Sequence, residues 1–229
     1  MASSSKSSVS LKEIQAKIAA TAADIPSHRA AFKQGYSFSD EAFETQLPVW
    51  NEAWLSGNYR VMLHAYFFLE HYVKHKRLHE AIWQTSKAWQ QQVDDWSLCD
   101  CLAKVNTKVL ETLPGEVYST FAEWNKSGNL WMRRQSVVSL LYYSRTKKVY
   151  LPFKKIAALV APLLSDKEYY VQKGAGWTLR EMHNVYPAET MAFVQQHIKS
   201  ISAIAFTIAI EKMTLEEKDA LKKVRKPLP

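Results

Sequence analysis

The amino-acid sequence predicts an all-α protein built from antiparallel pairs of helices. Apolar residues recur at steps of three and four along most of the chain, which is the spacing of one helix face, and strand-like alternation is scarce. Only six glycines and eight prolines interrupt the 229 residues. The interruptions leave room for helices of about 10–18 residues joined by short loops, an arrangement that favours antiparallel neighbours.

The N-terminal stretch MASSSKSSVS contains no apolar segment and is therefore not a secretory signal. We expect residues 1–9 to form a disordered tail and residues 10–226 to form a single helical-repeat domain with no long internal linker. The first capping signal is Asp40, which stands before a run of good helix formers and predicts a helix start there.

Five later segments carry the helical pattern. They are residues 59–75, 94–113, 130–145, 156–164 and 170–185. Turn-forming residues separate them at positions 56–58, 113–115, 127–129 and 186–187. Ser165, with Glu168 three residues later, has the spacing of a capping box and predicts the start of the last of these helices.

Comparable breaks recur about every 35–45 residues, near the period of HEAT-type helical repeats. Stacked pairs of this kind form a superhelical solenoid whose concave face suits a long ligand, and we expect this fold. No repeated sequence motif accompanies the spacing, so a compact helical bundle is the alternative.

The charge balance favours a polyanionic partner, because 30 Lys and Arg against 22 Asp and Glu give a net charge of +8. Cys99 and Cys101 lie two apart on an expected helix and point to different faces, so we expect no disulfide and a reducing cytoplasm. The longest apolar run, residues 201–210, is too short to span a bilayer. These features predict a soluble cytoplasmic protein.

Three pairs of aromatic and charged residues share helix faces, at spacings of three or four. The pairs are Trp96 with Asp100, Trp131 with Arg134, and Trp177 with Arg180. Outward aromatic rings and a lone acid in a basic protein suggest a site for a charged, planar group carried on a polyanion, such as a damaged DNA base. Each pair also has a structural interpretation, since tryptophans pack between helices, acids favour helix N-termini and arginines form surface ion pairs.

Three blocks extend these pairs into longer patterns. They are residues 96–100 (Trp-Ser-Leu-Cys-Asp), residues 129–134 (Asn-Leu-Trp-Met-Arg-Arg) and residues 165–181, which contain Tyr-Tyr-Val-Gln-Lys followed by Gly-Trp-Thr-Leu-Arg-Glu. The blocks resemble the bacterial DNA alkylation repair family of AlkD-like DNA glycosylases, whose fold is a superhelix of HEAT-like pairs. The resemblance covers roughly residues 40–200, and the third block is the most specific part of it.

Carried over position by position, the resemblance implies a role for each site residue. Asp100 would be the catalytic carboxylate, and Trp96 and Trp177 would flank the lesion-bearing nucleotide at its sugar and phosphate. Arg134 would hold a backbone phosphate near the lesion. Arg133 and Arg180 are further candidates, either facing the cleft or held in salt bridges.

The implied activity is hydrolysis of the N-glycosidic bond of cationic alkylpurines, of the N3-methyladenine and N7-methylguanine type, as a step of base excision repair. Alkylation makes the purine a good leaving group, so one carboxylate can stabilise the developing sugar cation and activate a water. Indole faces attract cationic groups, and arginine binds phosphate. We expect a nucleoid-associated monomer that binds duplex DNA, needs no cofactor or metal, and works without flipping the base.

Two departures from the family pattern leave other functions open. Ala31 stands where a site tyrosine is expected, with Tyr36 or Phe38 as possible substitutes, and residues 202–206 lack the usual arginines. One alternative is a helical-repeat protein that binds DNA without catalysis; the other is a protein–protein scaffold. His71, His75 and His79 lie four apart, but no further acid or cysteine completes a metal site and basic neighbours would repel a cation.

Overall fold

The structure, a computed structural model, describes residues 2–225, with side chains from residue 9 onward. Every regular element in that range is a helix, thirteen α-helices and four short 3-10 helices, which confirms the predicted all-α class. The chain forms two compact units whose boundary falls between Val93 and Asp94. The expectation of one domain over residues 10–226 stays a prediction. No helix within residues 2–225 has both the length and the apolar character needed to cross a membrane.

The first unit has an aromatic core. Its elements are α1 (Ala2–Ala19), α2 (Ile25–Lys33), α3 (Phe43–Leu55), α4 (Tyr59–Tyr72), η1 (Lys76–Leu78), α5 (His79–Trp89) and η2 (Gln90–Gln92). Trp54 stacks on Trp89 with ring centroids 4.6 Å apart, and Phe43 stacks on Phe68 at 5.1 Å. Residues 2–9, for which the sequence predicts a disordered tail, lie in α1.

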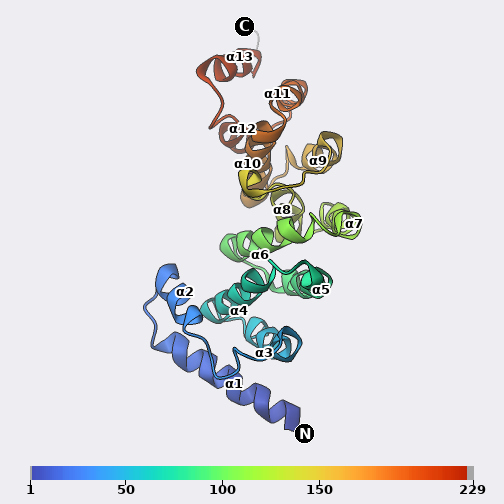
Figure 1. The fold of residues 1–229 in the computed structure, drawn as a ribbon. Helices are drawn as coiled ribbons and strands as arrows, with labels where there is room; N and C mark the ends of the chain where they lie inside the picture. Colours follow the sequence, from blue (N-terminus) through green and yellow to red (C-terminus); the bar gives the residue numbers. More distant parts are fainter. Residues whose placement is uncertain (1, 226–229) are drawn as a thin grey trace. The chain divides into compact units, whose positions relative to one another are not determined.

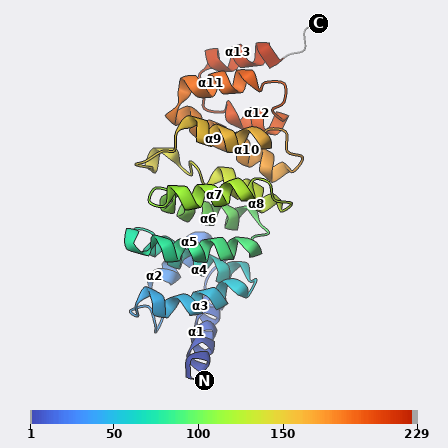
Figure 2. The same ribbon diagram turned by 90° about the vertical axis from the view of Figure 1, so that its right-hand side faces the viewer.

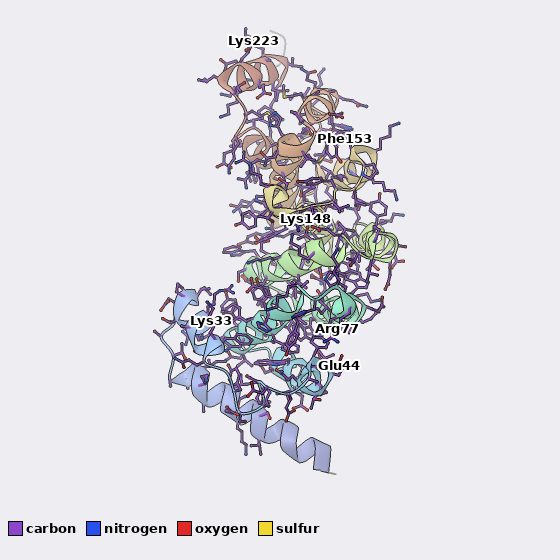
Figure 3. The ribbon with its side chains drawn as sticks, viewed as in Figure 1. Lys33, Glu44, Arg77, Lys148, Phe153 and Lys223 are labelled. Carbon is purple, nitrogen blue, oxygen red and sulfur yellow. The ribbon has the colours of Figure 1, made fainter. Side chains whose placement is uncertain are left out.

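The second unit consists of two layers of helices. Its elements are α6 (Trp96–Val109), α7 (Pro114–Trp124), α8 (Leu130–Val138), η3 (Ser144–Thr146), α9 (Phe153–Val160), η4 (Ala161–Leu163), α10 (Tyr169–Val185), α11 (Pro187–Gln196), α12 (Ala203–Ala209) and α13 (Leu215–Arg225). Helices α6, α8, α10 and α12 follow one another in one layer, and α7, α9 and α11 cover them from the other side (Figures 1 and 2). Phe153 of α9, labelled in Figure 3, packs edge-on against Tyr186 and Phe193 beside α11.

The first layer repeats near the lower end of the predicted spacing of about 35–45 residues. Its four helices begin at Trp96, Leu130, Tyr169 and Ala203, which are 34, 39 and 34 residues apart. Three of the four starts are fixed by side-chain caps. Asp95 accepts from the Ser97 backbone N–H at 2.7 Å, Asn129 accepts from Trp131 at 2.8 Å, and Ser202 accepts from Ala205 at 3.1 Å.

Two predicted caps are wrong. Helix α3 begins at Phe43 after Ala42, and Asp40 lies in the preceding turn. Ser165 lies in the turn before α10, and this helix begins after Glu168, whose side chain makes no cap. Asp166, which is held by Arg133, accepts from the Glu168 backbone N–H at 2.9 Å instead.

One predicted helix is too long. The pattern over residues 130–145 predicts a continuous helix, but α8 ends at Val138 and the chain continues as turns and the short helix η3. The reason is a tertiary contact: the backbone N–H of Ser144 donates to the buried carboxylate of Glu181 on α10, 37 residues away in sequence.

Candidate active site

The candidate site begins at the start of α6. Because Asp95 caps this helix, Trp96 is its first residue, and its indole is 49% exposed. Asp100 follows one turn later on the same helix face, as the four-residue spacing predicts. The structure therefore keeps Trp96 and Asp100 on one side of α6, at its N-terminal end.

Arg134 of α8 pairs with Asp100. Its Nη2 donates to Oδ1 of Asp100 at 2.7 Å and its Nη1 donates to the backbone carbonyl of Tyr170 at 2.8 Å. Arg134 is only 7% exposed, whereas a quarter of the Asp100 side chain is exposed. No described residue hydrogen-bonds to Oδ2 of Asp100. The pair thus presents one free carboxylate oxygen, oriented by a buried arginine.

Burial and charge act in opposite directions on this pair. Burial raises the pKa of Asp100 above its ordinary value, and the positive charges of Arg134 and Lys173 limit the rise. For Arg134, burial is the largest influence and disfavours the charge, but the charges and hydrogen bonds of Asp100 and Cys99 together outweigh it, and the pKa of the guanidinium is raised. Arg134 therefore stays cationic, and its charge helps to keep the half-buried Asp100 ionised.

Helix α10 contributes Trp177 to a cluster of aromatic side chains. Trp177 is half-buried and packs on Tyr142, with centroids 5.4 Å apart, and on the edge of Tyr143 at 6.1 Å. Burial chiefly, with the charge of Asp100 second, raises the pKa of Tyr142, which puts this phenol within electrostatic range of the carboxylate. Trp131 lies on the Tyr170 ring at 5.1 Å.

Sequence reasoning missed Tyr142, Tyr143 and Lys173 as neighbours of the site. No local signal marks Tyr142 or Tyr143, because the helical pattern continues through them. By contrast, the sequence does contain a local signal for Lys173, because this residue lies four positions before Trp177 and shares its helix face.

The other two arginines form ion pairs. Arg133 donates from Nε to Asp166 at 2.7 Å and also binds the carbonyls of Ser127 and Gly128, so it ties two loops together. Arg180 donates to Glu211 at 2.6 Å, with its guanidinium 5.8 Å from the centre of the Trp177 ring. Of the two orientations that the sequence left open for these residues, the structure has the salt bridges.

The first departure from the family pattern lies in the core of the first unit. Ala31, Tyr36 and Phe38 are all buried, and the Tyr36 hydroxyl contacts Nδ1 of His64 at 2.5 Å. Tyr36 and Phe38 are therefore core residues in this structure and do not present a surface ring in place of the missing tyrosine.

The second departure forms a surface hollow. Ser202 caps α12, and this helix, with Tyr169 and Lys173 of α10, lines a hollow of about 310 Å³. The lining is mostly apolar and includes Ile204, from the segment without arginines, and Ile208 further along α12.

The three histidines do not share one helix, because α4 ends at Tyr72. His75 lies in the following turn, and His79 begins α5 with its Nε2 2.7 Å from the carbonyl oxygen of Val73. Among the described side chains, no group of three His, Cys, Asp or Glu residues could hold a metal ion.

Fold and site together define a class of protein: an all-α helical-repeat protein with a carboxylate–arginine pair set among aromatic side chains. The family model described as "DNA alkylation repair enzyme" matches residues 12–213. The chain therefore belongs to the DNA alkylation repair enzyme family, as the sequence blocks predict.

Two solved structures from Streptococcus mutans have a similar fold. AlkD2 is 18% identical over 93% of this chain and 97% of its own, with a TM-score of 0.54. The protein smu.31 from strain UA159 is 19% identical over 89% of this chain and 92% of its own, with a TM-score of 0.52. No curated protein matches the chain. At these identities the two structures support the HEAT-like fold and do not identify the reaction.

Proposed function

We propose that this protein is a DNA glycosylase that hydrolyses the N-glycosidic bond of cationic alkylpurines in duplex DNA. The observation that carries the proposal is the geometry of Asp100: a partly exposed carboxylate with one free oxygen, held at 2.7 Å by a buried arginine and bordered by exposed and half-buried aromatic rings. Family membership supplies the substrate class, alkylated DNA.

The chemistry needs little more than such a carboxylate. A purine alkylated at N3 or N7 carries a positive charge, so its bond to deoxyribose breaks with cationic character on the sugar. The Asp100 carboxylate stabilises that charge and accepts a proton from the attacking water through its free oxygen. Trp96 and Trp177 attract the cationic sugar and base by cation–π interactions of about 0.5–2 kcal/mol each.

The test is release of free N7-methylguanine from duplex DNA by wild type and by Asp100→Asn. The asparagine can still accept from Arg134, so we expect a folded protein that binds DNA but releases base at least about 100-fold more slowly, the low end for loss of a general base. Asp166→Asn is the matched control, because it makes the same change in another aspartate–arginine pair of the same unit.

Three results are informative. Release by wild type and Asp166→Asn but not by Asp100→Asn supports the glycosylase. Salt-sensitive binding of damaged DNA without release from any lesion tried refutes it in favour of a DNA-binding repeat protein. Absence of DNA binding would favour a protein–protein scaffold.

A further inference from the structure

The turn after α8 lies where the sequence predicts a continuous helix. Residues 139–145 contain no glycine or proline and continue the helical pattern, yet α8 stops at Val138. Tyr143 adopts φ 47° and ψ 68°, and it is the one non-glycine residue with positive φ among residues 2–225. A bulky side chain pays a conformational cost in this left-handed region, so surrounding contacts must impose it.

The contacts come from Glu181 of α10. Its carboxylate is 5% exposed, and Oε2 accepts from both the backbone N–H of Ser144 at 2.9 Å and its hydroxyl at 2.6 Å. Asn184 donates to the same oxygen at 3.3 Å, and Nε of Arg180 lies 3.7 Å from Oε1. A buried carboxylate is costly unless hydrogen bonds satisfy its oxygens. The hydrogen bonds from Ser144 meet this need and at the same time fix the turn.

The turn presents an aromatic ring to solvent at the edge of the site. Tyr143 is 56% exposed, while its ring meets the edge of Trp177 at 6.1 Å and that of Tyr142 at 4.8 Å. Tyr142 in turn packs on Trp177 and lies within range of the Asp100 charge. Strain, buried support and exposure thus coincide at one residue that packs against Trp177 of the candidate site, which is the pattern expected of a ligand contact.

We propose that Tyr143 is a DNA-contacting residue whose ring packs against the deoxyribose and base edge of the damaged strand next to Asp100. Glu181 is its positioning residue and acts through Ser144. This inference rests on the proposed function, since DNA must reach the Asp100 site. Exposed aromatic rings bind nucleotides by stacking on sugars and bases, and a ring held by a fixed backbone loses little freedom on binding.

The decisive variant is Tyr143→Gly, because glycine relieves the left-handed backbone while deleting the ring. We expect the thermal midpoint to stay equal or rise, and the Kd for a duplex with an abasic-site analogue to increase about tenfold, as for loss of one stacking ring. Tyr143→Phe keeps the ring and should bind like wild type. Val149→Ala is the control, since Val149 is equally exposed, at 56%, in the segment that follows.

A double-mutant cycle tests Glu181. Glu181→Ala removes the acceptor of both Ser144 hydrogen bonds. It should weaken DNA binding in the wild-type background and add nothing in the Tyr143→Gly background, because both changes act through the same ring. A purely structural role would lower the thermal midpoint in both backgrounds with no such coupling in Kd.

The outcomes separate this inference from the proposed function. Wild-type binding and base release that survive unchanged in Tyr143→Gly would overturn the role of Tyr143 and leave the glycosylase intact. Loss of binding in Tyr143→Gly, from a wild type that binds but releases no base, would uphold the contact and refute the reaction. A wild type that binds no DNA would overturn both.

Discussion

Two glycines of α10, two residues apart, should respond to alanine in opposite ways. A Cβ on Gly174 would lie 3.2 Å from Cγ of Arg134, 3.2 Å from Cγ2 of Val138 and 3.3 Å from Nη1 of Arg134. A Cβ on Gly176 would lie 2.5 Å from the carbonyl oxygen of Ala205 and 2.8 Å from its Cα. The first clash is with side chains that can yield, and the second is with the backbone of α12.

The magnitudes follow from these distances. Alanine gains about 1 kcal/mol over glycine inside a helix, and overpacking costs about 1–3 kcal/mol. At Gly174, where a few tenths of an ångström relieve the contacts, the net loss is about 0–1 kcal/mol. At Gly176, where two helix backbones must separate, the net loss is about 2 kcal/mol or more. That loss corresponds to a fall in thermal midpoint of about 4–8 °C for a chain of this size.

Base release should be reduced more by Gly174→Ala than by Gly176→Ala, the reverse of the order for stability. In Gly174→Ala the displaced side chain is Arg134, which orients Asp100, so we expect base release to fall about tenfold because small misplacements of catalytic groups are costly. Single-turnover release from N7-methylguanine DNA and thermal unfolding of both variants measure the two effects. A Gly174→Ala protein with the wild-type rate, or a Gly176→Ala protein with the wild-type midpoint, would refute the reasoning.

Three further predictions concern charged groups of the same unit. Arg133→Ala should lower stability by about 3–5 kcal/mol, the range for breaking a largely buried ion pair, and leave DNA affinity unchanged, as thermal unfolding and a binding titration would show. Base release should be lost as pH falls through the raised pKa of Asp100; a rate profile whose acid limb lies at or below the ordinary value of 3.8 would contradict this. Burial lowers the pKa of Lys147 from 10.5 to about 8, so between those values the unfolded chain holds a proton that the folded chain lacks, and stability should rise with pH. Urea unfolding across that window should show the rise in wild type and a flatter profile in Lys147→Met.

The helical pattern located three helix starts of the second unit well, whereas α9 begins at Phe153, three residues before the predicted segment 156–164. The start of α8 was predicted at Leu130, its first residue, and α6 and α10 begin within two residues of their predicted starts. These starts depend on short-range chemistry, such as the Asn129 side chain accepting from a backbone N–H two residues later. The family blocks then pointed to Asp100 and Arg134, which the structure joins directly.

The failures come from side-chain contacts that the helical pattern does not indicate, one local and one between distant residues. Asp40 was expected to cap α3, but the amide of the buried Gln46 binds the carbonyls of Ser39 and Glu41 and shapes the turn before the helix. The end of α8 was missed because Glu181 captures Ser144 from a distant helix. Neither contact can be predicted from the helical pattern of the sequence alone.

The position of Arg134 calls for a different role from the one that the resemblance implies. A phosphate contact needs an accessible guanidinium, but this one is 7% exposed, with Nη1 on the Tyr170 carbonyl and Nη2 on Asp100. In this geometry the guanidinium orients the Asp100 carboxylate and favours its ionised form. Arg134→Lys keeps the charge and loses the two-pronged geometry, so we expect base release to fall while the Kd for duplex DNA and its salt dependence stay unchanged. A direct phosphate contact predicts the reverse, a weaker Kd and a salt slope reduced by about one ion. Binding titrations at several salt concentrations, beside single-turnover rates, decide between the two roles.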